Sequence, residues 1–128
     1  MLDLQGPCPC GSGEAYAQCC QPIHVGDKPA ANPEALMRSR YTAFALGFSE
    51  YLKASWSVLT RPEELELDPA QEWTRLRILD APAPEGNTGY VRFRAHYKYR
   101  GERGYLEEHS RFSKENGEWV YVDGEIFE

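Results

Sequence analysis

All four cysteines of the chain lie between positions 8 and 20, so any thiol chemistry is confined to this short stretch. Cys8 and Cys10 form one close pair, Cys19 and Cys20 form a second, and eight residues separate the two pairs. Zinc prefers four thiolate or imidazole ligands in a tetrahedron, and a structural zinc site fills all four positions, so no place remains for a reacting water. The spacing therefore predicts a structural Zn²⁺ site with these four cysteines as ligands.

The residues between the two cysteine pairs are suited to bringing the pairs together. Residues 11–13, Gly-Ser-Gly, are a flexible turn whose amides could donate hydrogen bonds to the thiolates, and residues 14–18 can form one helical turn. The alternatives are free thiols or a pair of disulfides, but disulfides between neighbouring cysteines would form strained small rings and cross-pairing would close only a tiny loop. His24 is an alternative ligand, but four cysteines already complete the site, so we expect His24 to be a loop residue.

This stretch resembles the SEC-C motif, a short zinc-binding module found at the C-terminus of the SecA translocation ATPase and in many uncharacterised bacterial proteins. The matching residues are Cys8, Pro9, Cys10, Gly11, Ser12, Gly13, Tyr16, Cys19 and Cys20. In that family the fourth ligand is Cys or His, and Cys20 takes that place here. Family members usually carry lysines in the short helix, where this chain has Glu14, Ala15, Ala17 and Gln18. Because the SecA module docks proteins, the resemblance implies that the partner is another protein.

Length and charge restrict the remaining possibilities. A chain of 128 residues can bury one modest core, so we expect one globular domain with the metal knuckle as an appendage. The formal net charge of -6 becomes about -8 when four thiolates surround a divalent ion, and it opposes binding to nucleic acid and to anionic membranes. The sequence shows no signal peptide or membrane-length apolar run, and zinc-binding thiols need a reducing compartment. We therefore expect a soluble, cytoplasmic protein without a membrane span.

The chain divides into three parts: residues 1–24 form the cysteine module, residues 25–32 a linker, and residues 33–128 the main domain. Asn32 and Pro33 are typical of a helix start, and Gly47 is typical of a helix end. An apolar stripe at helical spacing consists of Met37, Tyr41, Phe44 and Phe48. Ser49 can cap a second helix. A loop follows, with one further helical turn expected at residues 69–73.

The pattern then changes to a period of two, which is typical of strands. Alternation predicts four strands at about residues 75–78, 91–100, 106–113 and 118–123. Hairpin turns are expected at residues 101–104 and at Asn116-Gly117. Helices followed by an antiparallel meander predict an α+β domain in which the helical layer covers one face of a curved sheet.

This order of elements resembles the YchJ family, also known as UPF0225. Three local sequences carry the resemblance: Arg38-Ser39-Arg40-Tyr41, Glu108-His109-Ser110-Arg111-Phe112 and Trp119-Val120-Tyr121-Val122-Asp123-Gly124. The family pairs SEC-C motifs with a cone-shaped NTF2-like domain. The resemblance therefore implies an N-terminal zinc knuckle followed by an NTF2-like cone of helices packed on a curved antiparallel sheet.

NTF2-like folds commonly hold a pocket between helices and sheet, and the resemblance implies four candidate residues: Arg40, Tyr41, Glu108 and Ser110. By alternation, Glu108 shares a face with Phe112, so its carboxylate should be buried and should need a partner. One interpretation is a general base or a ligand anchor. The other is a structural ion pair with Arg38 or Arg40, which we favour because no second acid or nucleophile accompanies Glu108.

The opposite sheet face carries a basic stripe that consists of Arg92, Arg94, His96, Lys98, His109 and Arg111. Such a stripe can meet phosphate, but it is also typical of a solvated face neutralised across strands by Glu107 and Glu118, which we favour. The leading hypothesis is a zinc-binding adaptor that binds another protein. The alternative is a small enzyme with Glu108 as general base and Tyr41 as hydrogen-bond donor. Nucleic-acid or ribosome association is less favoured, and the sequence does not indicate an oligomeric state.

Overall fold

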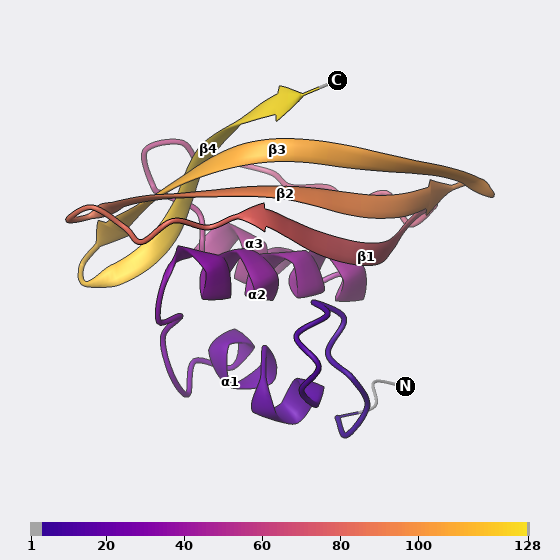
Figure 1. Ribbon diagram of the computed structural model, residues 1–128, viewed down its shortest axis with the longest axis horizontal. Helices are drawn as coiled ribbons and strands as arrows, with labels where there is room; N and C mark the ends of the chain where they lie inside the picture. Colours follow the sequence, from indigo (N-terminus) through magenta and orange to yellow (C-terminus); the bar gives the residue numbers. More distant parts are fainter. Residues whose placement is uncertain (1–3, 128) are drawn as a thin grey trace.

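The computed structural model describes residues 4–127. Its elements are η1 (Tyr16–Gln18), α1 (Gln21–His24), α2 (Pro33–Leu46), α3 (Ser49–Ala54), β1 (Gln71–Asp80), β2 (Thr88–Tyr99), β3 (Glu102–Glu115) and β4 (Glu118–Phe127). The strands form one antiparallel sheet in the order β1-β2-β3-β4. Figure 1 shows the curved sheet lying over α2 and α3, with α1 and the N-terminal segment on the other side of α2. The predicted α+β architecture is confirmed.

Helix α2 begins and ends where the sequence predicts. The Asn32 side chain accepts a hydrogen bond of 2.8 Å from the amide of Ala35, and Gly47 ends the helix with a left-handed φ of 81°. Helix α3 begins at Ser49 with Phe48 in the cap position, so the prediction that Ser49 caps this helix is wrong by one residue. No helix within residues 4–127 is long and apolar enough to cross a membrane.

Two-residue turns join β2 to β3 and β3 to β4. Arg100 and Gly101 have φ values of 52° and 86°, and Asn116 and Gly117 have values of 55° and 81°. Positive φ at both positions is the type I′ geometry, whose twist matches that of the flanking strands. The second turn lies where it was predicted. The first is shorter than the predicted four residues, because β3 already begins at Glu102.

Strand β1 begins earlier than predicted, and the helical turn expected at residues 69–73 is wrong. Trp73 pairs in register with Tyr97 of β2, and their ring centroids are 5.7 Å apart. On its other side, the Trp73 ring meets Tyr41 of α2 at 6.4 Å. These contacts form only when Trp73 lies on an extended strand beside β2, so tertiary packing overrides the local helical signal.

The hydrophobic core lies between α2 and the sheet and continues into the cysteine module. Its buried members are Cys8, Cys10, Tyr16, Cys20, Leu36, Met37, Tyr41, Leu76, Val91, Phe93, Ala95, Phe112 and Trp119. Helix α2 therefore contacts the sheet with one side and the cysteine module with the other. This arrangement fixes the module on the main domain.

Candidate functional site

The cysteine side chains are brought together by a loop that closes on itself. The amide of Cys8 donates a hydrogen bond of 2.9 Å to the carbonyl oxygen of Glu14. Gly11 turns the chain with a φ of 79°, a conformation that glycine adopts without steric cost, and donates to the carbonyl oxygen of Cys8 at 3.1 Å. The short helix η1 then carries the second cysteine pair back to the first.

The four cysteine Sγ atoms lie within 4.8 Å of one another. The distance between Sγ atoms is 3.6 Å for Cys10 and Cys19 and 4.0 Å for Cys19 and Cys20. A tetrahedral site with metal–sulfur bonds of ~2.3 Å has sulfur–sulfur edges of ~3.8 Å, which agrees with these values. All four residues are free thiols, not disulfides. The cluster is therefore placed to hold one metal ion.

The surroundings of the cluster also suit a metal-thiolate site. Three of the four cysteines are buried, and Cys19 is half-buried. Burial raises the pKa of Cys19 to about 11, which disfavours the thiolate, and the charge of a bound divalent cation would offset this effect. Thr42 donates a hydrogen bond of 3.4 Å to Cys20 Sγ, and Ser12 Oγ lies 3.1 Å from Cys19 Sγ. Such hydroxyl groups orient thiolate ligands from outside the coordination sphere.

His24 is outside the cysteine cluster. It is the last residue of α1 and half-buried, so the prediction of a loop residue is wrong. Its Nε2 lies 2.7 Å from the carbonyl oxygen of Ser39 and must donate, because that oxygen can only accept. The neutral ring then accepts at Nδ1 from the Tyr16 hydroxyl, also at 2.7 Å. Burial lowers the pKa of His24, which favours this neutral bridge between the cysteine module and α2.

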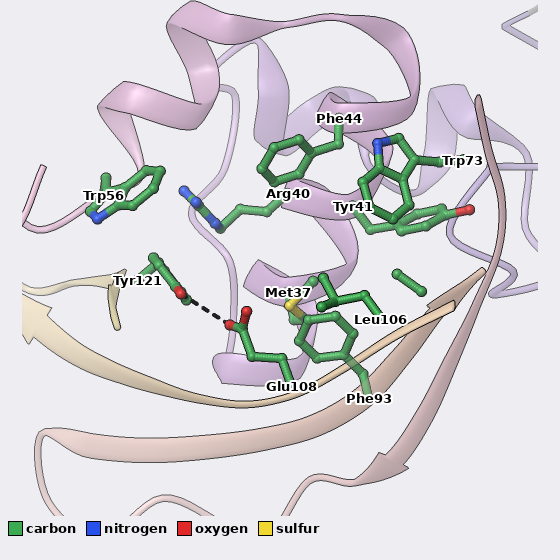
Figure 2. A pocket seen from close by; sticks show the side chains of 11 residues that line it. Met37, Arg40, Tyr41, Phe44, Trp56, Trp73, Phe93, Leu106, Glu108 and Tyr121 are labelled. Atoms are coloured by element: carbon green, nitrogen blue, oxygen red, sulfur yellow. Dashed lines mark hydrogen bonds between the residues drawn. The ribbon is translucent and has the colours of Figure 1, made fainter. Parts of the chain in front are cut away.

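A cavity of about 260 Å³ lies between α2 and the sheet (Figure 2). It is lined by Met37, Arg40, Tyr41, Phe44, Trp56, Trp73, Phe93, Ala95, Leu106, Glu108 and Tyr121. Three of the four residues named from the sequence, Arg40, Tyr41 and Glu108, therefore lie on its wall. The fourth, Ser110, is fully buried and contacts Glu108 instead.

Glu108 is held by hydroxyl groups, and its carboxylate forms no ion pair within residues 4–127. Ser110 Oγ donates to Glu108 Oε2 at 2.5 Å. The Tyr121 hydroxyl donates to the same oxygen at 3.0 Å (Figure 2). Within residues 4–127, no ion pair joins Glu108 to Arg38 or Arg40, so the predicted structural ion pair is wrong. Arg38 contacts the cysteine module, and Arg40 is held by α3.

The Arg40 side chain is buried and bridges α2 to α3. Its Nη1 donates to the carbonyl oxygen of Leu52 at 2.8 Å and to Ser55 Oγ at 2.7 Å. Its Cζ lies 5.0 Å from the centroid of the Trp56 ring and 4.6 Å from that of Tyr121. Burial lowers the pKa of Arg40 to about 10, which still leaves the guanidinium charged at neutral pH. The cavity therefore has one cationic group and one carboxylate on its wall.

Sequence reasoning missed Tyr121 as a partner of Glu108. The hydroxyl of Tyr41, which was assigned a donor role, points away from Glu108 in Figure 2, and burial raises its pKa to about 12. Tyr121 pairs in register with Phe112, which shares a sheet face with Glu108. The predicted two-residue turn at residues 116–117 already implies this pairing. The sequence therefore indicates that Tyr121 and Glu108 share a sheet face, whereas their hydrogen bond is found only in the structure.

The basic stripe on the outer sheet face is partly neutralised. Arg92 and Arg94 both bind the Glu107 carboxylate, at 2.5 and 2.7 Å. The prediction that Glu107 neutralises the stripe is therefore confirmed. Glu118 instead lies opposite Glu115 at the β3–β4 turn, so its predicted part in this neutralisation is wrong.

Comparison with known families agrees with this architecture. The model of the YchJ middle NTF2-like domain matches residues 32–124, and that of the SEC-C motif matches residues 7–22. A UPF0225 protein of Streptomyces coelicolor is 49% identical over 124 residues, which cover 95% of this chain and 97% of that protein. The chain belongs to the UPF0225 (YchJ) family. A UPF0225 protein of Corynebacterium glutamicum is 48% identical over 93% of this chain and 96% of its own length.

Solved structures of two SEC-C motif containing proteins are similar to this UPF0225 chain. A solution structure from Rhodopseudomonas palustris has a TM-score of 0.86 and 33% identity, and covers 96% of this chain and 100% of its own. A crystal structure from Psychrobacter arcticus has a TM-score of 0.83 at 24% identity, and covers 100% of this chain and 86% of its own. The predicted NTF2-like domain with an N-terminal SEC-C knuckle is confirmed.

Proposed function

We propose that this UPF0225 protein is a zinc-binding adaptor whose metal module presents a surface to another protein. The observation that carries the proposal is the convergence of four free thiols within 4.8 Å. Cys8, Cys10, Cys19 and Cys20 would hold the ion and fill all four positions, so a structural role fits better than a hydrolytic one. A bound zinc ion would supply folding free energy to the module.

The exposed part of the module is the surface that we propose for the partner. Residues 11–14 are exposed, whereas the opposite side of the module rests on α2. There Arg38 Nη1 donates to the carbonyl oxygen of Cys10 at 2.8 Å, which fixes the orientation of the loop. Glu14 and Gln18 are exposed where SEC-C relatives usually carry lysines, so the surface offered to the partner is not basic.

Charge and thiol chemistry support the rest of the proposal. We propose a cytoplasmic protein, because four zinc-binding thiols need a reducing compartment. The net charge of -6 favours a protein partner over nucleic acid or the ribosome. We also propose that residues 1–24 act as the metal module, residues 25–32 as a linker and residues 33–128 as the NTF2-like domain; residues 1–3 and 128 lie outside the described part.

Proximity labelling in the native host tests the adaptor role. We compare the wild type, a double variant Glu14→Lys with Gln18→Lys, and Glu108→Gln, all with matched zinc content. We expect a partner that is labelled by the wild type and by Glu108→Gln but lost in the double variant. The same labelling by all three proteins would contradict the proposed surface.

Small-molecule binding in the cavity is a second candidate function. The specific observation is that Glu108 lies on the cavity wall and has hydroxyl partners but no ion pair within residues 4–127. Glu108 is then either an anchor for the ligand or, in an enzyme, the general base. Catalysis would need a second reacting group, so ligand binding is the simpler function.

A further inference from the structure

We propose that the cavity binds a neutral aromatic molecule carrying one group that both accepts and donates hydrogen bonds, such as a carboxamide or a lactam. The proposal rests on the second candidate function, binding in this cavity, and adds the chemical class of the ligand. Size, wall composition and the placement of two charged side chains each restrict that class.

The walls of the cavity are largely aromatic. Six rings contribute to them: Tyr41, Phe44, Trp56, Trp73, Phe93 and Tyr121. Flat rings favour a flat, apolar ligand that packs edge to face or offset against them. The volume of about 260 Å³ is slightly below the ~300–1,000 Å³ usual for ligand pockets, so a ligand of one or two rings fits best.

Two polar groups face this apolar space. Within the described part of the chain, both hydrogen bonds to the Glu108 carboxylate end on Oε2, which leaves Oε1 as an acceptor. The Nη1 of Arg40 has two acceptors, whereas its Nε and Nη2 have none within residues 4–127, which leaves them as donors. Figure 2 shows both side chains at the same cavity. A ligand group that accepts from Arg40 and donates to Glu108 satisfies both at once.

The charges exclude a strongly ionic ligand. An anionic ligand would be attracted by Arg40 but repelled by the Glu108 carboxylate. A cationic ligand would be attracted by Glu108 but repelled by Arg40. The faces of Trp56 and Tyr121 could otherwise attract a ligand cation, but Arg40 already lies over both, at 5.0 and 4.6 Å. A neutral ligand avoids either repulsion.

Three probes with the same ring test the class: benzamide is neutral, benzoate is an anion and benzylammonium is a cation. Each is titrated at millimolar concentration into the full-length, zinc-loaded protein, with amide NMR shifts of the cavity residues as the readout. We expect saturable shifts with benzamide, and at least about tenfold weaker binding of the two charged probes.

Glu108→Gln identifies the polar contact. We expect it to weaken benzamide binding about tenfold, because a charge-assisted hydrogen bond becomes a neutral one, and to strengthen benzoate binding. Glu125→Gln is the matched control, because Glu125 is exposed on β4 and the substitution changes the net charge equally. It should leave all three affinities unchanged.

The outcomes separate the ligand class from the cavity function. If benzoate or benzylammonium bound in the cavity as tightly as benzamide, the proposed class would be wrong while the binding function stood. Benzamide binding that is insensitive to Glu108→Gln would also overturn the proposed contact. If no probe shifted the cavity residues, both the class and the binding function would be overturned. The comparison of probes on the wild type decides the class even if Glu108→Gln does not fold.

Discussion

Thr42 Oγ1 donates a hydrogen bond of 3.4 Å to Cys20 Sγ and lies 3.7 Å from Cys8 Sγ. Thr42 is fully buried and belongs to α2, the helix that also packs against the sheet. The SEC-C module thus packs against a helix of the NTF2-like domain, and a cysteine sulfur of the module is oriented from the larger domain. We therefore expect metal binding and the stability of the whole chain to be coupled.

Thr42→Val should lower zinc affinity. Valine keeps the shape of the side chain but removes the hydroxyl that orients Cys20, and loss of an outer hydrogen bond to a metal ligand typically costs about 10–100-fold in affinity. Competition with a chelator measures the change. Thr60→Val is the control, since its hydroxyl also donates one hydrogen bond, to the carbonyl oxygen of Val122, but far from the sulfurs. Equal zinc affinity in both variants would contradict the role of Thr42.

Gly124→Ala should destabilise the domain through Glu108. A Cβ at Gly124 would overlap the Glu108 carboxylate. Alanine is ordinarily better than glycine in a strand by about 0.5–1 kcal/mol, whereas steric overlap in a packed site costs about 1–3 kcal/mol. We expect a net loss in the free energy of unfolding, measured with denaturant. Combining Gly124→Ala with Glu108→Ala should remove the loss, and an unchanged loss in the double variant would place the clash elsewhere.

Arg40→Lys should also lower stability. Lysine cannot reproduce the paired hydrogen bonds to Leu52 and Ser55 or the stacking on Trp56, and it leaves a buried ammonium. We expect a loss of about 2–4 kcal/mol in the free energy of unfolding. Arg77→Lys, at an exposed position of β1, serves as the control and should change stability by less than about 0.5 kcal/mol. Similar values for both variants would mean that Arg40 does not join α2 to α3 as described.

His24 should titrate below its ordinary pKa of ~6.5, because burial disfavours the imidazolium. The unfolded chain then binds more protons than the native one as the pH falls below ~6.5. The contribution of neutral His24 to the free energy of unfolding is therefore complete above pH ~6.5 and decreases as the solution becomes more acidic. NMR titration of the His24 ring measures the pKa directly, and His24→Gln should reduce the pH dependence of unfolding. A midpoint at or above ~6.5 would contradict the neutral bridge.

Local signals in the sequence account for much of the fold. The limits of α2 follow from Asn32 and Gly47, whose backbone preferences need no tertiary contact. The Asn116-Gly117 turn fixes the register of β3 with β4 as far as the pair Phe112 and Tyr121, beyond which a bulge shifts it. Alternation assigns Glu108 to the inner face. The four cysteines also predict the metal module without any tertiary contact, because their spacing in the sequence alone restricts how the four thiols can be arranged.

Features that depend on tertiary contacts were not predictable in this way. Strand β1 extends back to Gln71 because Trp73 packs between β2 and α2. His24 is half-buried because α1 lies on α2, and its partner there is the backbone carbonyl of Ser39, which the sequence pattern does not indicate. The hydroxyl partners of Glu108 were missed because an arginine is the expected partner of a carboxylate predicted to be buried, whereas Glu108 is half-buried in the structure. Arg40 instead points toward α3, where it bonds to Leu52 and Ser55, so it does not form an ion pair with Glu108.

The metal content of the wild type and of two variants tests the claim of a four-cysteine zinc site most directly. Native mass spectrometry and elemental analysis are applied to the wild type, Cys19→Ser and Thr60→Val after purification under reducing conditions. We predict one zinc ion per chain in the wild type and in Thr60→Val, and loss of the ion together with a lower melting temperature in Cys19→Ser. Absence of metal from the wild type, or unchanged zinc content and stability in Cys19→Ser, would contradict a four-cysteine zinc site.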